Sequence, residues 1–138
     1  MSSSEADRSG GCLCGAVRYR VLGELRAVVI CHCSRCRRVH GHVGAYTEAA
    51  SKDLVLLAER SVRWYVADGR ERGFCRECGA TLFWRQVGAD RTSITAGTLD
   101  EPTGLRTAAH IFVASKGDYY EIVDDLPTFS AGLVTGAA

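Results

Sequence analysis

The sequence predicts a small, mainly β domain whose sheet is supported by bound metal. Two observations lead to this prediction: short apolar stretches bounded by turn residues recur along the chain, and seven cysteines fall into tight groups. A chain of 138 residues is long enough to bury one core and too short for two. We therefore expect a single-domain, zinc-supported β-sheet fold with one or two short helical turns.

The two ends of the chain offer little that a core could bury. Residues 1–8 are polar, and residues 131–138 are mostly small. We expect a disordered N-terminus over 1–8, a folded domain over 9–130 and a flexible C-terminal tail over 131–138.

The first half of the domain is expected to form four strands and one helical turn. Between residues 16 and 22 apolar side chains alternate with arginines, which is typical of a half-buried strand. A short apolar strand delivers Cys31 at its end, and Ser34 can cap a helical turn over 35–39 that Gly41 terminates. The expected strands are 16–22, 27–30, 43–47 and 54–57, with turns at 23–24 and 51–53.

The second half is expected to contain only strands and turns. Asp68-Gly69 is a strong hairpin signal because this turn needs positive φ. We expect Trp64, Phe83 and Trp84 to pack in the core. The expected strands are 62–66, a returning strand that ends at 74–75, 81–85, 92–98, 110–114 and 119–123.

Charge and hydropathy exclude several classes of partner. The 17 Lys+Arg and 16 Asp+Glu nearly cancel, so no global basic field favours nucleic acid. No stretch approaches the ~20 apolar residues of a membrane span, and the N-terminus lacks the apolar run of a signal peptide. We expect a cytoplasmic protein with no membrane contact. Clustered cysteines in a reducing compartment indicate metal ligands or catalytic thiols, and an odd count of seven also favours metal.

Cys31, Cys33 and Cys36 fall within six residues, a density that indicates a common ligand. In an extended segment the first two share a face at about 6.6 Å between Cα atoms. Tetrahedral zinc needs sulfurs about 3.8 Å apart, and the two-residue spacer can turn the third sulfur toward the same ion. Three ligands leave the fourth position open, as catalytic zinc sites do.

The other four cysteines form a CxC motif, Cys12 and Cys14, and a CxxC motif, Cys75 and Cys78. Together they can supply one complete four-thiolate set, which is typical of structural zinc. Seven cysteines therefore divide naturally into four plus three.

Basic residues surround the three-cysteine motif. Arg35 and Arg38 are candidates for binding the carboxylates of a peptide-like thiol, and His40 is a candidate proton shuttle because imidazole titrates near neutrality. A solvated basic turn and a surface histidine are the competing interpretations. The other neighbours of this kind are His32, Arg37 and His42.

Three further polar residues have structural interpretations that we prefer. His110 is expected to be a hydrogen-bonded core histidine, because its strand places it on one face with Phe112 and Ala114. Asp100 and Lys116 are expected to form loop ion pairs.

Several segments resemble, in order, the glutathione-dependent formaldehyde-activating enzymes. They include Gly11-Cys-Leu-Cys-Gly-Ala-Val-Arg-Tyr19, Cys31-His-Cys-Ser-Arg-Cys36 and Phe74-Cys-Arg-Glu-Cys-Gly79. The remaining segments are 97–100, 110–116 and 125–127. A departure is Tyr119-Tyr120, which stands where many relatives have a tryptophan.

The resemblance implies the Mss4-like fold, shared with small zinc-binding chaperones of nucleotide-free GTPases, over residues 9–130. It also implies two Zn²⁺ per chain: a structural ion on Cys12, Cys14, Cys75 and Cys78, and an active-site ion on Cys31, Cys33 and Cys36. The implied activity is that of a zinc-dependent carbon–sulfur lyase that forms or cleaves S-hydroxymethylglutathione or a similar adduct. Its expected partners are glutathione or a similar thiol and a small aldehyde.

Two other functions compete with this interpretation. In a non-catalytic zinc module for protein–protein interaction, His32, His40 or His42 would close the second site as a fourth ligand. A redox role for Cys33 and Cys36 is disfavoured, because such CxxC pairs usually open a helix in a βαβ context.

Overall fold

The computed structural model describes residues 7–133 and confirms a mainly β chain. Within this range one α-helix is present, α2 (Ser34–His40), and no helix is both long and apolar enough to cross a membrane. Of the two terminal segments expected from the sequence, residues 1–6 and 134–138 lie outside the described range. Contacts divide the chain into two compact units. The first contains the described residues up to Arg26 and Thr47–Gly104, and the second contains Ala27–Tyr46 and the described residues from Leu105.

A three-stranded antiparallel sheet in the first unit has the order β1-β2-β5. Strand β1 was not expected from the sequence, because two of its residues are glycines and it has no apolar alternation. Gly10 lies opposite Tyr19 in the pairing of β1 with β2, and a Cβ at Gly10 would collide with the Tyr19 ring. The bounds are β1 (Arg8–Gly11), β2 (Arg18–Val21) and β5 (Leu54–Ala58).

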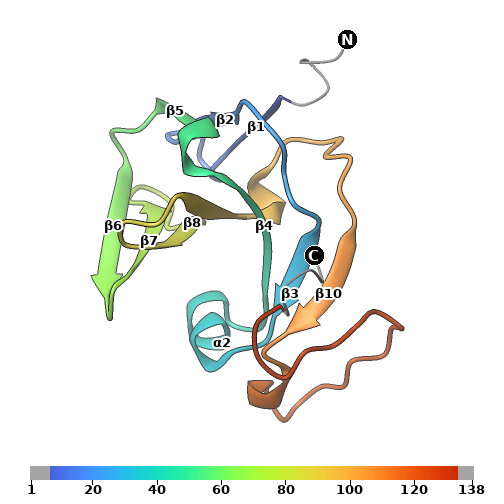
Figure 1. The fold of residues 1–138 in the computed structure, drawn as a ribbon. Helices are drawn as coiled ribbons and strands as arrows, with labels where there is room; N and C mark the ends of the chain where they lie inside the picture. Colours follow the sequence, from blue (N-terminus) through green and yellow to red (C-terminus); the bar gives the residue numbers. More distant parts are fainter. Residues whose placement is uncertain (1–6, 134–138) are drawn as a thin grey trace. The chain divides into compact units, whose positions relative to one another are not determined.

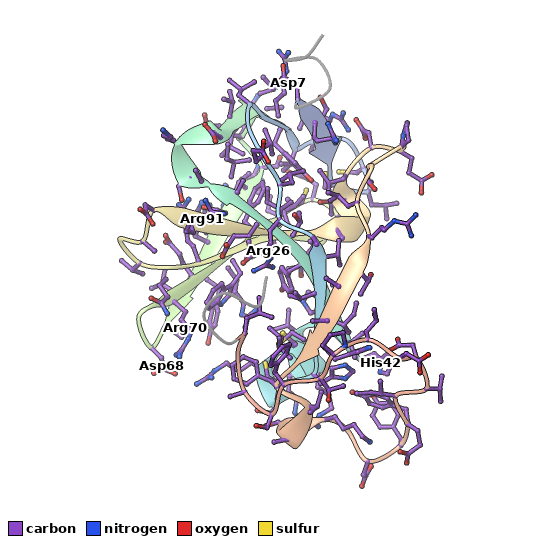
Figure 2. The ribbon with its side chains drawn as sticks, turned by 45° about the vertical axis from the view of Figure 1, so that its right-hand side comes forward. Asp7, Arg26, His42, Asp68, Arg70 and Arg91 are labelled. Atoms are coloured by element: carbon purple, nitrogen blue, oxygen red, sulfur yellow. The ribbon has the colours of Figure 1, made fainter. Side chains whose placement is uncertain are left out.

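The other strands of the first unit follow the order β9-β8-β7-β6, and residues 47–50 of β4 lie next to β9. The predicted hairpin between β6 and β7 is confirmed: Asp68 and Gly69 have φ of 55° and 74°, and Figure 2 shows Asp68 and Arg70 at its tip. The predicted strand 92–98 ends early, because residues 96–98 form a 3-10 turn. The bounds are β4 (Gly44–Ala50), β6 (Val62–Ala67), β7 (Arg70–Cys75), β8 (Thr81–Gln86) and β9 (Arg91–Thr95).

The core of the first unit is built around Tyr19 and Phe83, which are both fully buried. Their rings meet edge to face at 5.3 Å, and Trp64 stacks on Phe83 at 6.0 Å. The prediction of core packing is therefore confirmed for Phe83 and supported for Trp64. Trp84 is half-buried on the opposite face of β8, where it pairs with Arg72.

The second unit places two parallel strands side by side, β3 (Val28–Cys31) and β10 (Thr107–Ile111), with residues 44–46 of β4 antiparallel to β3 (Figure 1). The chain leaves β3 at Cys31 and enters α2 at Ser34, three residues later. The parallel strands therefore end at the segment that carries the three-cysteine motif.

The N-terminal cap of α2 differs from the prediction. Cys33, and not Ser34, is the cap: it has extended backbone angles, and its sulfur accepts a hydrogen bond from the Cys36 amide at 3.3 Å. The predicted C-terminal boundary is confirmed, because Gly41 has φ of 80° and donates its amide to the Arg37 carbonyl.

The chain after β10 contradicts two predicted strands. Residues 119–123 form no strand, and the strand predicted at 110–114 ends at Ile111, because Phe112 turns the backbone with φ of 57°. The edge of β10 is instead covered by residues 127–129, through hydrogen bonds of 2.9 Å between His110 and the backbones of Pro127 and Phe129. The segment between β10 and residue 127 forms no strand. Its two tyrosines, Tyr119 and Tyr120, contact the side chains of His42 and His32.

Candidate metal centres and active site

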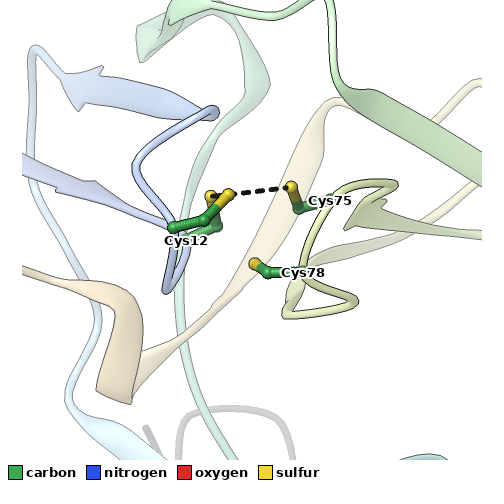
Figure 3. Close-up of side chains that lie close together, drawn as sticks. Cys12, Cys75 and Cys78 are labelled. Atoms are coloured by element: carbon green, nitrogen blue, oxygen red, sulfur yellow. Dashed lines mark hydrogen bonds between the residues drawn. The ribbon is translucent and has the colours of Figure 1, made fainter.

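Four cysteine sulfurs converge in the first unit. Cys12 and Cys14 precede β2, Cys75 ends β7 and Cys78 lies in the turn before β8. Their sulfurs all lie within 4.8 Å of one another, with 3.7 Å between Cys12 and Cys14 and 3.9 Å between Cys14 and Cys75 (Figure 3). Zinc with tetrahedral bonds of about 2.3 Å needs sulfurs about 3.8 Å apart. The group therefore fits a metal site closed by four thiolates.

The turn after β7 is shaped to hold sulfur as an anion. Gly79, with φ of 77°, donates its amide to the Cys75 carbonyl at 2.7 Å, and the Glu77 amide points at the Cys75 sulfur at 3.3 Å. A hydrogen bond from the Ala80 backbone lowers the pKa of the Cys78 thiol to about 6. Backbone amides aimed at sulfur favour the thiolate, which is the form that binds metal.

Three cysteine sulfurs converge separately in the second unit. Cys31 ends β3, Cys33 caps α2 and Cys36 lies in the first turn of α2. Their sulfurs also lie within 4.8 Å of one another, and Cys31 and Cys36 are buried. In the described part of the chain no histidine, aspartate or glutamate joins this group. It can therefore supply three ligands and leave a fourth position to another molecule.

The crowding of these three thiols makes their ionisation unequal. Hydrogen bonds from Cys31 and then Cys36 lower the pKa of Cys33 to about 2. Hydrogen bonding with Cys33 raises the pKa of Cys31 to about 11, and the same crowding raises that of Cys36. The first thiol therefore ionises easily, and its negative charge opposes ionisation of the other two. Three thiolates can coexist here only beside a cation. The donor set thus fits a soft divalent metal such as zinc.

His32 lies between two of these cysteines, and both its ring nitrogens have partners elsewhere. Nδ1 lies 2.5 Å from the Tyr120 hydroxyl, and Nε2 lies 2.8 Å from Nδ1 of His110. The other nitrogen of His110 lies 3.0 Å from the Asp124 carboxylate. The expectation of a buried, hydrogen-bonded His110 is confirmed. His32 has no ring nitrogen left for a metal in this arrangement.

The two other neighbouring histidines also contact tyrosines. His40 Nε2 lies 2.6 Å from the Tyr46 hydroxyl, and His42 Nδ1 lies 2.8 Å from the Tyr119 hydroxyl. Figure 2 shows His42 beside the segment that follows β10. Neither histidine belongs to the three-sulfur group, so the geometry disfavours a closed second site.

The family model of the glutathione-dependent formaldehyde-activating enzyme matches residues 7–115, which is most of the chain. The chain belongs to this family. The match covers both cysteine groups, which therefore lie within the region that defines family membership.

Two curated relatives and one solved structure agree with this assignment. An uncharacterized lyase of Schizosaccharomyces pombe is 25% identical over 88% of this chain and 89% of its own length. A putative glutathione-dependent formaldehyde-activating enzyme of Halomonas elongata is 31% identical over 82% of this chain and 79% of its own length. The crystal structure of a Rhodobacter sphaeroides protein superposes with a TM-score of 0.57, at 26% identity, over 72% of this chain and 97% of that protein.

Three arginines of α2 differ in their exposure. Arg35 and Arg38, the predicted carboxylate ligands, are exposed on α2. Arg37 is half-buried, and its Nε has no hydrogen-bond partner among residues 7–133. Burial raises the pKa of the Tyr120 hydroxyl; negative charge on Cys31 adds to this rise and positive charge on Arg37 opposes it. The charges of Cys31 and Arg37 therefore both act on the Tyr120 hydroxyl.

The remaining predicted polar residues have structural roles. Asp100 forms the expected ion pair, at 2.6 Å from Arg18. Lys116 forms no ion pair with residues 7–133: its ammonium donates to the carbonyls of Gly117 and Tyr120, and so fixes the segment that carries this tyrosine.

Tyr120 and Asp124, the hydrogen-bond partners of His32 and His110, were not expected from the sequence. The tyrosine was noted only as a departure from the family pattern, and the aspartate not at all. The sequence did offer one signal for Asp124. It directly precedes the Asp125-Leu-Pro127 segment of the resemblance, and a carboxylate is a common partner for a buried histidine such as His110.

Proposed function

We propose that this chain is a zinc-dependent carbon–sulfur lyase of the glutathione-dependent formaldehyde-activating type. In this proposal it forms or cleaves S-hydroxymethylglutathione or a similar thiol adduct. The observation that carries the proposal is the group of Cys31, Cys33 and Cys36, whose sulfurs converge with no histidine, aspartate, glutamate or further cysteine of the described residues to complete them. The names of the two relatives, a lyase and a putative formaldehyde-activating enzyme, support the same class.

The proposal assigns two Zn²⁺ to each chain. The first is held by Cys12, Cys14, Cys75 and Cys78, and the second by Cys31, Cys33 and Cys36. The purely thiolate donor sets support zinc at both positions. At the first position the sulfur spacings of 3.7 and 3.9 Å support it as well. Zinc at the second position supplies the charge that keeps a bound thiol deprotonated at neutral pH.

The reaction joins a thiol and an aldehyde without any net redox change. The substrate sulfur forms a bond to the carbonyl carbon, and the π electrons of the carbonyl move to its oxygen. That oxygen takes up the proton that the thiol gave up, which yields the hydroxymethyl thioether. Cleavage is the same sequence in reverse, so one site serves both directions.

The chain's own side chains are assigned to binding and proton transfer. Arg35 and Arg38 are proposed to attract the carboxylates of a peptide-like thiol from the exposed side of α2. His40 stays the candidate proton carrier, with its Nε2 fixed by Tyr46. Residues up to 130 are included in the functional domain, since Asp124 and Phe129 both bond to His110.

The test is the rate at which the protein interconverts free and adduct-bound formaldehyde. Exchange NMR with glutathione and formaldehyde at equilibrium separates catalysis from the uncatalysed addition. We expect faster exchange with the wild-type protein than with buffer, and a return to the buffer rate for Cys33→Ser. Exchange at the buffer rate with folded, zinc-replete wild-type protein would refute the enzyme and favour the non-catalytic zinc module.

A further inference from the structure

The two cysteine groups differ in their exposure to solvent. In the three-cysteine group Cys31 and Cys36 are buried, with exposures of 7% and 5%. In the four-cysteine group Cys14 is exposed, and its neighbour Leu13 has an exposure of 88%. Of the seven cysteines, all of which lie within residues 7–133, Cys14 alone is exposed. A dissolved reagent therefore meets the four-cysteine group first, at Cys14.

A second sulfur on a distant segment lies in contact with Cys14. The Cys14 sulfur is 3.9 Å from that of Cys75, which is fully buried at the end of β7 (Figure 3). The Cys12 sulfur is as near, at 3.7 Å, but only one residue separates it from Cys14. A disulfide torsion near 90° strains so small a ring. Cys75 is therefore the favoured partner for a covalent bond to Cys14.

Both sulfurs are held in the form that oxidants attack. Metal coordination keeps a thiol deprotonated, and the thiolate is the form that peroxides oxidise. The Cys75 sulfur also accepts from the Glu77 amide at 3.3 Å, which favours its thiolate. An exposed thiolate in contact with a second sulfur is the arrangement typical of redox-sensitive cysteines.

We propose that Cys14 is an oxidation site, at which a hydroperoxide such as hydrogen peroxide converts Cys14 and Cys75 into a disulfide. The Cys14 sulfur forms a bond to one peroxide oxygen, the O–O bond breaks, and the other oxygen leaves as hydroxide. The Cys75 thiolate then forms a bond to the Cys14 sulfur, and the sulfenic hydroxyl leaves as a second hydroxide. Two electrons pass from the two sulfurs to the peroxide, which is the oxidant.

Oxidation changes what links the two segments but not which segments are linked. The disulfide leaves Cys12 and Cys78 as the remaining thiolates of the group, and two ligands hold zinc less tightly than four. The new bond joins positions 61 residues apart, as the metal does. The oxidised chain should therefore lose zinc from this group and keep its fold. This inference rests on the metal proposed for the four-cysteine group and not on the proposed reaction.

Peptide mapping identifies the first oxidation product. Zinc-replete, reduced wild-type protein is treated with hydrogen peroxide, its free thiols are alkylated, and the tryptic peptides are analysed by mass spectrometry. Trypsin cuts after Arg76 and so separates Cys75 from Cys78. We expect a link between peptides 9–18 and 73–76 before any product of the three-cysteine group appears.

Fragmentation of the linked peptides shows which sulfur of the CxC motif took part. We expect the alkyl label on Cys12 and the link on Cys14. A first product that joins Cys75 to Cys78, joins Cys12 to Cys14, or lies in the three-cysteine group would overturn the inference.

Two variants and the release of zinc complete the test. Cys33→Ser leaves the four-cysteine group intact and should form the disulfide at the wild-type rate, whereas Cys14→Ser should not form it. If Cys14→Ser is insoluble, the map of the wild-type product still decides. A metallochromic dye should report loss of the zinc of this group as the disulfide forms, with unchanged far-UV circular dichroism. Disulfide formation that unfolds the chain or releases no zinc would contradict the proposed exchange of metal for disulfide.

Zinc content measured before oxidation separates this inference from the proposed function. Protein without zinc at the four-cysteine group would contradict the proposed structural ion, while the peptide map would still decide whether Cys14 is oxidised first. Oxidation that begins in the three-cysteine group would refute the inference and leave the proposed lyase activity standing.

Discussion

Replacing one cysteine in each group should separate a structural metal from a functional one. A metal at the four-cysteine group links segments that are 61 residues apart in the chain. If this link is treated like a disulfide, its loss returns about 4 kcal/mol of conformational entropy to the unfolded chain. The three cysteines of the other group lie within six residues, for which the same relation gives about 2 kcal/mol. Only the first metal joins distant parts of the fold.

We therefore expect Cys78→Ser to lower the free energy of unfolding by about 4 kcal/mol, or to prevent soluble expression. Cys33→Ser should cost no more than about 2 kcal/mol, because serine is itself a good helix cap and can replace the sulfur that accepts from Cys36. The assay is urea unfolding of zinc-replete, reduced protein by far-UV circular dichroism, together with zinc content per chain.

Equal losses of stability for the two variants would refute this reasoning. So would a Cys33→Ser protein that is folded and still holds two zinc ions. Titration of wild-type protein with a chelator is an independent check: the first zinc to leave should not change the circular dichroism, and the second should.

Three further predictions concern the stability of each unit. Burial raises the pKa of Tyr19 from 10.0 to about 12, so the stability that the buried neutral phenol contributes is present below pH 10 and is lost as pH rises through 12. Over this range the free energy of unfolding of the wild type should fall by about 3 kcal/mol relative to that of Tyr19→Phe. Parallel plots of unfolding free energy against pH for the two proteins from about pH 9 to about pH 12 would contradict this prediction. Phe83→Ala leaves a cavity under Tyr19 and Trp64 and should cost about 4 kcal/mol in urea unfolding; a cost below about 1 kcal/mol would contradict the assigned core. Gly41→Ala forces alanine into φ of 80° and should cost about 1 kcal/mol by thermal unfolding, with an unchanged Tm as the contrary result.

Local signals in the sequence predicted most strands correctly. Alternation around Tyr19, the Asp68-Gly69 dipeptide and the terminating Gly41 each act over a few residues, so the chain itself carries the information. The strand β1 was missed because its pairing depends on a glycine that lets Tyr19 approach, and a glycine pair resembles a loop in sequence.

The cysteine groups were predictable and the residues around them were not. The spacing of the CxC, CxxC and CxCxxC motifs, together with the odd number of cysteines, was enough to divide the seven cysteines into groups of four and three. The partner of His32, in contrast, lies 88 residues away, in a segment that was expected to be a strand. No periodicity links such residues, and only the path of the chain after β10 brings Tyr120 to the histidine. The cap of α2 was misplaced for a related reason, since cysteine is not a usual cap and takes this role beside other sulfurs.

The most direct test of two unlike metal sites is zinc-edge X-ray absorption of the zinc-replete protein with and without glutathione. A closed four-sulfur site and an open three-sulfur site should average about 3.5 sulfurs per zinc, with the remainder a lighter ligand. Addition of glutathione should raise the average to about 4. An unchanged spectrum, or four sulfurs per zinc before any thiol is added, would contradict the account.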